Sequence, residues 1–253
     1  MGIASTDTAL AYESHGTGTP VVLLHGLTFD RTSWRPIVER LADDVRSIAI
    51  DLPAHGESGR APCTLDDVAA QVHGLVEQLS IDRPIIVGHS MSGAVTMLYA
   101  AAYPTRGAVV VDQAFDIRPF ARFARQLEPA LRGPAFEQAF APFQQSMGLH
   151  LVPQVPRQEI RQDVVLGYWE QLLRSDPEEL QAWIDRVALT ISVPCLALFG
   201  SALADADRDR IAAQAPTVEI EEWDGDGHCL HLVEPHRFAA RLRRFVEDCS
   251  ARG

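Results

Sequence analysis

The chain has 253 residues, of which 47% are hydrophobic and 22% are charged, with 17 glycines and 16 prolines. This length and composition suit one globular domain, or one domain with an insertion, and exclude the disordered, collagen-like and disulfide-scaffold classes. The 22 Lys and Arg against 34 Asp and Glu leave a net charge of −12. Such an acidic surface argues against nucleic acid as a partner, because it repels phosphate groups.

The N-terminus and the cysteines predict a cytoplasmic protein. Residues 1–8 contain neither the basic start nor the apolar stretch of a signal peptide. No apolar run approaches the roughly 18 residues that a membrane-spanning helix needs. The 4 cysteines lie far apart and none forms a CxxC pair, which favours reduced thiols over a zinc ribbon or a redox dithiol. We therefore expect no membrane contact, no metal and no cofactor.

Short apolar runs alternate with helical spacing in the first half of the chain. Runs rich in Val, Ile and Leu are typical of buried parallel strands, and here they cover 20–24, 46–50, 84–87 and 108–111. Apolar residues at helical spacing cover 32–42, 65–79 and 91–103. Strands separated by helices predict an α/β fold, with a mostly parallel sheet flanked by helices on both faces.

The strand pattern stops between about residues 115 and 190. We expect four helices there, and the segment also concentrates eight Phe and Trp side chains; the helices are expected at 118–131, 135–147, 158–174 and 177–187. Strands resume at 194–199 and 217–222, and a last helix covers about 235–249. The sequence therefore predicts an α/β core of residues 1–114 and 191–253 that carries a helical insertion at 115–190.

The strongest chemical signal is VGHSMSG at 87–93, between a predicted strand and a predicted helix. A serine on such a turn is held in a strained backbone, with its Oγ above the sheet at the N-terminus of the helix. The N–H of Met91 would face a developing oxyanion there, and the helix dipole favours negative charge. Ser92 occupies a position where glycine is usual. The motif predicts Ser90 as a nucleophile; the alternative is an ordinary strand–glycine–helix turn.

A second signal is DGHCLHL at 226–232, after the last predicted strand. A serine hydroxyl is a weak nucleophile at neutral pH and needs a base, which is usually histidine. His228 lies in a glycine-flanked loop downstream of Ser90 and is the predicted base. One alternative is a solvated loop histidine. The other is a metal site of His228, Cys229 and His231, which has no acidic ligand at a suitable spacing.

The third signal is His25-Gly26-Leu27, directly after the apolar run 20–24. Glycine lets the backbone turn beneath a substrate, so that the N–H of Leu27 can act as a second oxyanion donor beside that of Met91. The alternative is an ordinary turn at the end of a strand.

Taken together, these segments resemble the α/β-hydrolase fold superfamily, in its capped small-molecule branch. The matching segments are LLHGLTFDRTSW (23–34), DLPAHGESG (51–59), VGHSMSG (87–93), VPCLALFG (193–200) and GDGHCLHLVEPHRF (225–238). The resemblance implies an eight-stranded sheet with the active site at its carboxyl edge and a helical cap inserted after the sixth strand. It also implies that Ser90 is the nucleophile, His228 the base, and Leu27 and Met91 the oxyanion donors. Asp51 and His55 would then be structural.

The acid of the triad is the point at which the sequence departs from the family pattern. The usual position after the glycine of the seventh strand holds Leu203, while Asp205 and Asp207 follow closely and could equally cap a helix. Some family members place this carboxylate at the end of the sixth strand, where Asp112 stands. We favour Asp112, with Asp205 as the alternative and Asp207 or no acid after it. A carboxylate is needed because it orients the imidazole and stabilises its cationic form.

These features predict a serine hydrolase that transfers the acyl group of a small, moderately hydrophobic ester, thioester or lactone. The aromatic residues of 115–190 favour a largely apolar pocket. Two other hypotheses remain. The same triad could serve C–C hydrolysis, perhydrolysis or a lyase or cyclase step in secondary metabolism, or the protein could be a ligand-binding protein on a hydrolase fold. A small-molecule substrate is the expected partner, and a homodimer is left open.

Overall fold

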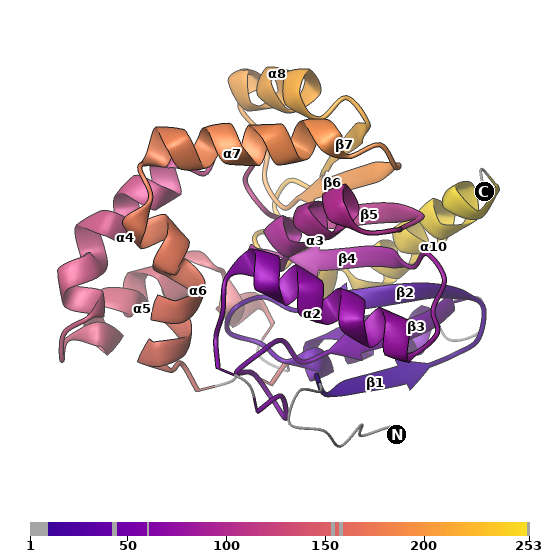
Figure 1. The fold of residues 1–253 in the computed structure, drawn as a ribbon, viewed down its shortest axis with the longest axis horizontal. Coiled ribbons are helices and arrows are strands. Elements are labelled where there is room, and N and C mark those ends of the chain that lie inside the picture. The colour runs from indigo at the N-terminus through magenta and orange to yellow at the C-terminus, as the bar shows by residue number, and fades with distance from the viewer. Residues whose placement is uncertain (1–9, 42–44, 60, 153–154, 157–158, 252–253) are drawn as a thin grey trace.

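One sheet of seven strands forms the centre of the described part of the chain (Figure 1). The structure is a computed structural model, and it describes residues 10–41, 45–59, 61–152, 155–156 and 159–251. The strands are β1 (Tyr12–His15), β2 (Thr19–Leu24), β3 (Val45–Ile50), β4 (Ile85–His89), β5 (Gly107–Val111), β6 (Cys195–Phe199) and β7 (Val218–Glu222). Their order is β1-β3-β2-β4-β5-β6-β7, and only β1 runs antiparallel to its neighbour.

The predicted mostly parallel α/β sheet is therefore confirmed. Apart from β1, each strand matches a predicted apolar run to within two residues. The resemblance implies eight strands, whereas the described part of the chain forms seven. Residues 1–9 lie outside the described part.

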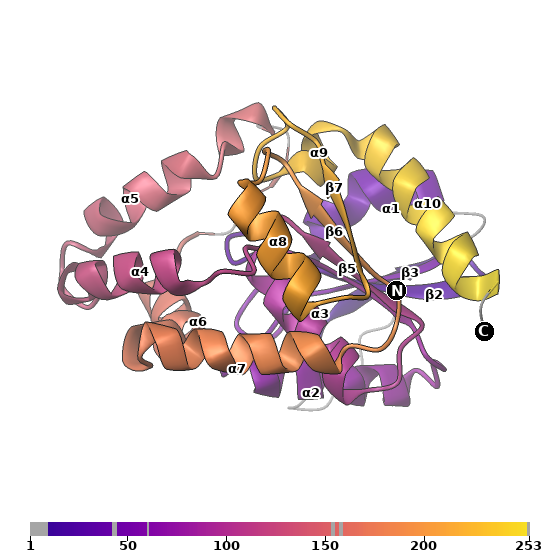
Figure 2. The same ribbon diagram turned by 90° about the horizontal axis from the view of Figure 1, so that it is seen from above.

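Helices cover both faces of the sheet (Figure 2). On one face, α2 (Leu65–Gln78) packs against α3 (Met91–Ala102), and on the other α1 (Arg35–Leu41) packs against α10 (Pro235–Ala251). Successive strand residues point to opposite faces. Accordingly, β2 contributes Val21 and Leu23 to one apolar cluster and Val22 and Leu24 to the other. Burial on both faces explains why these strands are continuous apolar runs.

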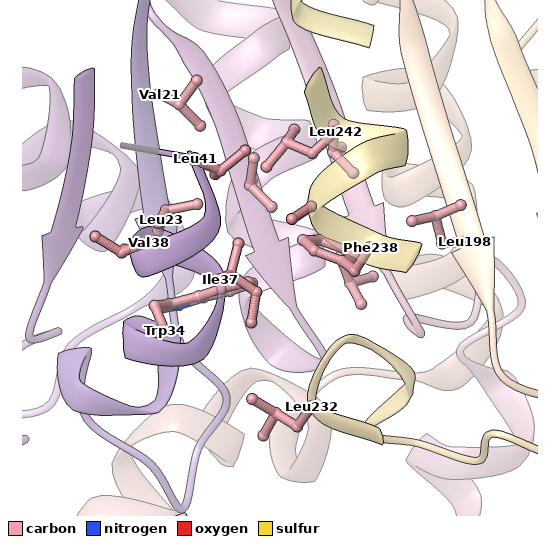
Figure 3. Packing of buried hydrophobic residues seen from close by; sticks show 14 of the residues in the cluster. Val21, Leu23, Trp34, Ile37, Val38, Leu41, Leu198, Leu232, Phe238 and Leu242 are labelled. Carbon is pink, nitrogen blue, oxygen red and sulfur yellow. The ribbon is translucent and has the colours of Figure 1, made fainter. Parts of the chain in front are cut away.

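Figure 3 shows the packing between α1, α10 and the sheet. Trp34, Ile37 and Phe238 are fully buried there, and the rings of Trp34 and Phe238 lie 6.0 Å apart. Trp34 ends a short 3-10 helix, η1 (Arg31–Trp34), which leads into α1. The single helix predicted at 32–42 is thus a 3-10 turn followed by an α-helix; Ala42 lies outside the described residues.

Among the described residues, four α-helices lie between β5 and β6 in the chain, within the segment where the sequence predicted them. They are α4 (Arg118–Leu131), α5 (Phe136–Ser146), α6 (Gln162–Arg174) and α7 (Pro177–Thr190), and a 3-10 turn, η2 (Leu149–Leu151), follows α5. Figures 1 and 2 show them gathered at one end of the sheet. They follow the fifth described strand, whereas the resemblance implied the sixth. The start predicted for the third of these helices, Gln158, lies outside the described residues.

Two further helices complete the chain. One is α8 (Asp205–Gln214), the helix that Asp205 and Asp207 were expected to cap if neither is the acid. Asp205 and Asp207 lie in its first turn, where negative charge interacts favourably with the helix dipole. The short helix α9 (Leu230–Val233) precedes α10. Among the helices of the described ranges, none is both long enough and apolar enough to cross a membrane.

Candidate active site

Ser90 lies on a sharp turn between β4 and α3. Its backbone has φ 56° and ψ −128°, in the positive-φ region that side chains rarely adopt. The turn needs a glycine before it, because a Cβ on Gly88 would lie 2.0 Å from the carbonyl oxygen of Ser92. The N–H of Ser90 donates to the carbonyl of Val111 at 2.8 Å, which ties the turn to the end of β5. The strained strand-to-helix turn predicted for Ser90 is present.

Asp112 and His228 meet at the carboxyl ends of β5 and β6. His228 Nδ1 lies 2.6 Å from Asp112 Oδ2, and the N–H of Gly200 donates to Asp112 Oδ1 at 2.9 Å. Since a carboxylate only accepts, His228 carries its proton on Nδ1. Its Nε2 is buried and has no hydrogen-bond partner among the described residues. In this structure Ser90 Oγ therefore does not donate to Nε2.

Asp112 is held in its charged form. Burial on its own would raise the pKa of this carboxyl, but the hydrogen bond and charge of His228, together with the N–H of Gly200, lower it below its usual value. Asp112 also has a positive φ of 50°. Like Ser90, it leaves its strand through an uncommon backbone conformation that directs a polar side chain to the sheet edge.

The two alternative acids lie away from His228. The side chain of Asp205 is 98% exposed and pairs with Arg208 on the same helix. Asp207 lies in the same first turn of α8 and lines the cavity described below, without a hydrogen bond to His228 among the described residues. Of the three candidate carboxylates, only Asp112 contacts the imidazole.

Leu27 and Met91, the candidate oxyanion donors, line the same cavity as Ser90. Met91 is the first residue of α3, and the first N–H groups of a helix have no partner within it. The chain turns sharply after β2, where the N–H of Phe29 donates to the carbonyl of Gly26 at 3.1 Å. Ser92 has a role that its sequence position does not reveal, since its buried hydroxyl donates to the carbonyl of His25.

Two further histidines lie beside His228: His231, which the sequence offered only as a metal ligand, and His89, which it did not single out. His89 and His231 are each 1% exposed, and their ring centroids lie 4.4 Å apart. Burial lowers the pKa of His231 to about 3, with a smaller contribution from His228, and burial also places the pKa of His89 well below its usual value. Both rings are therefore neutral near pH 7. The ring of His231 lies against those of Trp34 and Phe238, and its apolar sequence neighbours Leu230 and Leu232 were the local sign of its burial.

Asp51 and His55 lie in the loop after β3, apart from Asp112 and His228. Asp51 is fully buried and accepts hydrogen bonds from the guanidinium of Arg31 and from the N–H of Glu57. The ring nitrogens of His55 lie 3.0 Å from the carbonyl oxygen of Pro53 and 2.7 Å from that of Leu27. These contacts bind the loop to its neighbours, which is what a structural role requires.

A cavity of about 740 Å³ lies between the carboxyl edge of the sheet and helices α4–α7. This volume is in the range of small-molecule sites. Its core wall includes Leu27, Ser90, Met91, Asp112 and His228. Its opposite wall is mostly apolar and includes Phe120, Phe143, Trp169, Leu172, Leu180 and Trp183. The predicted nucleophile, base and acid thus border one space that a substrate could fill.

The placement of His, Cys, Asp and Glu side chains among the described residues bears on the alternative metal site. Across the described ranges, no three His, Cys, Asp or Glu side chains are placed so that they could hold a metal ion. His228, Cys229 and His231 therefore do not make up the metal site that was the alternative to a catalytic base.

A model of the alpha/beta hydrolase family matches residues 21–241. A 2-succinyl-6-hydroxy-2,4-cyclohexadiene-1-carboxylate synthase from Serratia proteamaculans (strain 568) is 27% identical over 242 residues, which is 89% of this chain and 92% of that one. Among solved structures, a thermophilic esterase from Thermogutta terrifontis has a TM-score of 0.78 at 22% identity, covering 95% of this chain and 93% of its own. A protein that cleaves the ring of the Pseudomonas quinolone signal also has a TM-score of 0.78, at 18% identity, with coverage of 97% and 100%.

Proposed function

This chain belongs to the alpha/beta hydrolase family, and we propose that it is a serine hydrolase with Ser90 as nucleophile, His228 as base and Asp112 as acid. The proposal rests above all on the 2.6 Å contact between His228 Nδ1 and Asp112 Oδ2. That contact leaves Nε2 as the basic nitrogen of the ring, in a cavity that Ser90 also lines. A base oriented by a carboxylate beside a strained serine is the arrangement that activates a hydroxyl.

The reaction begins when a substrate fills the cavity. His228 Nε2 takes the proton of Ser90 as Oγ attacks the substrate carbonyl, and the N–H groups of Leu27 and Met91 stabilise the oxyanion. His228 then gives the proton to the leaving alcohol or thiol. In the second half, it deprotonates a water that attacks the acyl-enzyme and regenerates Ser90. Asp112 stays ionised throughout, because its contacts lower its pKa.

The cavity favours a small, moderately hydrophobic ester, thioester or lactone without a carboxylate. Arg210 is the basic residue among its described lining residues, and it is already paired with Asp185 at 3.0 Å. Asp207 also lines the cavity, as does Asp116, which is paired with Arg118 at 2.6 Å. A substrate carboxylate would therefore meet like charge and no free cation. We further propose that residues 115–190 act as a cap that determines which acyl groups fit.

The function is tested with p-nitrophenyl esters. Wild-type protein should hydrolyse p-nitrophenyl butyrate faster than mono-p-nitrophenyl glutarate, which carries a carboxylate. Ser90→Ala should abolish turnover of both, because no other group supplies the nucleophile. A fluorophosphonate should label wild-type protein at Ser90 and leave Ser90→Ala unmodified. Equal ester turnover by wild type and Ser90→Ala would refute the assignment.

A second candidate function is a reaction in which the same triad acts on a bond other than an ester. The Serratia relative is named as a synthase and matches 89% of this chain, and one structural neighbour cleaves a ring. C–C hydrolysis, perhydrolysis or a lyase or cyclase step would use the same base and oxyanion donors. Comparing rates on esters, vinylogous diketones and peroxide-dependent halogenation would identify the preferred reaction. The third hypothesis, a binding protein, was motivated by the missing acid near Leu203, and Asp112 now supplies a carboxylate to His228.

A further inference from the structure

We propose that His89, the residue before Ser90, is a positioning residue that keeps the loop of His228 in register with the nucleophile turn. This inference rests on the proposed roles of Ser90 and His228. It concerns a side chain that takes no part in the acyl transfer described above.

The loop of His228 is attached to the sheet on one side by hydrogen bonds at the end of β6. The N–H of Gly227 donates to the carbonyl of Gly200 at 2.9 Å, and the N–H of Gly200 donates to Asp112 Oδ1 at 2.9 Å. With the Nδ1 contact to Asp112, these bonds fix the imidazole relative to β5 and β6. None of them connects His228 to the strand that carries Ser90.

His89 makes that connection. Its Nε2 lies 2.9 Å from the carbonyl oxygen of His228. A carbonyl only accepts, so His89 carries its proton on Nε2 and donates it. The donor is one residue from Ser90 in the chain, and the acceptor belongs to the base itself. This hydrogen bond therefore links the turn of Ser90 to the backbone of His228, and it takes no part in binding the substrate.

The ring of His89 is locked in place from several sides. It is 1% exposed, and its centroid lies 4.8 Å from that of His228 and 5.9 Å from that of Phe29. A Cβ on Gly26 would lie 2.8 Å from its Nδ1, so the turn before Leu27 also packs closely on it. The side chain thus contacts the base loop and the turn that carries the proposed oxyanion donor.

His89 is also suited to this role because its ring is uncharged near pH 7. Burial, followed by the nearby His231 and His228, lowers the pKa of His89 well below its usual value. The ring is then neutral near pH 7, and it adds no positive charge next to the imidazolium that forms on His228 during the reaction. A permanent, uncharged donor is therefore available in every step.

The test compares three substitutions at position 89 with one elsewhere. His89→Phe keeps a buried ring and removes the donor, His89→Gln restores an amide N–H at a similar reach, and His89→Asn offers the same amide on a shorter side chain. His236→Phe is the matched control, since His236 is exposed on α10. Fluorophosphonate titration counts the active sites, so that kcat is expressed per competent molecule.

We expect His89→Phe and His89→Asn to lower kcat by about 10- to 100-fold, because displacement of a catalytic group by about 1 Å can cost that much. KM should stay within about twofold of wild type, since substrate contacts are unchanged. His89→Gln should recover most of the loss, and His236→Phe should match wild type. A side chain that only stabilised the fold would change the melting temperature and the number of titrated sites, and would leave kcat per site unchanged.

The inference fails if His89→Phe keeps kcat per site within twofold of wild type, or if Gln and Asn behave alike. Crystal structures of wild type and His89→Asn provide a measurement that does not depend on turnover. They should show His228 displaced from Ser90 in the variant, and an unmoved His228 would overturn the proposal. If wild type hydrolyses no ester and takes no fluorophosphonate label, the proposed function fails, while the structures still decide the role of His89.

Discussion

The carboxyl edge of the sheet and helices α4–α7 form opposite walls of one cavity, and different forces hold them. At the sheet edge, Ser90 and Asp112 adopt positive φ and are tied across strands by backbone hydrogen bonds. In α4–α7, aromatic side chains pack on one another, as in the 5.1 Å contact between Phe120 and Trp169. Exposed ion pairs such as Arg122 with Glu178 lie outside them, and pairs of this kind contribute at most about 1 kcal/mol.

This difference suggests that the sheet edge sets the positions of the reacting groups, whereas α4–α7 set which substrates fit the cavity. Where backbone hydrogen bonds set positions, a small change displaces a reacting group. Where apolar side chains line a wall, a substitution changes the shape of the cavity at modest cost. We therefore expect changes at the sheet edge to act on kcat and on pH behaviour, and changes in α4–α7 to act on substrate preference.

After the loss of the nucleophile, the largest expected effect is at the proposed acid. Asp112→Asn should lower kcat/KM for p-nitrophenyl butyrate by about 10³- to 10⁴-fold, because an amide no longer stabilises the imidazolium and can favour the wrong tautomer. Asp205→Asn is the matched control and should stay within twofold of wild type, since Asp205 is exposed and pairs with Arg208. A large loss in Asp205→Asn with little loss in Asp112→Asn would reverse the assignment.

The next effect is on stability at low pH and also arises at the sheet edge. Burial, with the charge of His228, lowers the pKa of His231 from 6.5 to about 3 in the folded protein. Between these values the unfolded chain binds a proton that the folded protein does not, so stability falls as the pH falls. At pH 4.5 this one residue should cost about 3 kcal/mol relative to pH 7.

Denaturant unfolding of wild type and His231→Phe at pH 7 and pH 4.5 measures this contribution. The variant has no such proton site and should lose about 3 kcal/mol less than wild type between the two pH values. His236→Phe, at an exposed position, should lose as much as wild type. Equal losses in wild type and His231→Phe would show that the protonation of His231 does not limit acid stability.

A smaller effect is expected in α4, where two phenylalanines form a matched pair. Phe120 lines the cavity, whereas Phe123 is 39% exposed on the same helix. Phe120→Ala should raise KM for p-nitrophenyl hexanoate by about tenfold, because a longer acyl chain loses apolar contact. The acetate ester should be turned over within twofold of wild type, and Phe123→Ala should change neither. An equal effect on both esters would place Phe120 in catalysis and break the comparison.

The smallest effect is expected at Ser92. Ser92→Ala leaves the buried carbonyl of His25 without this donor, which should lower the free energy of unfolding by about 1–2 kcal/mol. Ser250→Ala, at an exposed position on α10, is the control and should stay within about 0.5 kcal/mol of wild type. Thermal and denaturant unfolding measure both. No change in Ser92→Ala would mean that this hydrogen bond adds nothing to stability.

The buried strands and their order along the chain were predictable because each is a local apolar run. The two edge strands are not continuous apolar runs: β1 is the polar YESH, and β7 is VEIEE, in which only Val218 and Ile220 are apolar. An edge strand needs no continuous apolar run, and the search for apolar runs did not detect β1. The strand-to-helix turn at Ser90 was likewise a local signal, since its strain and its small neighbours are encoded within seven residues.

The sequence by itself thus determined the α/β pattern, the helical segment between β5 and β6, and the turn that carries Ser90. The sequence favoured Asp112 over Asp205, but only the tertiary structure shows which of them contacts His228, because both follow strand ends at the same sheet edge. That contact depends on the positive φ of Asp112 and on a hydrogen bond between two residues that lie 116 positions apart in the sequence. The contact of His89 with the His228 carbonyl spans 139 positions and was invisible for the same reason. Local patterns specify elements, whereas contacts between distant residues form only when those elements pack.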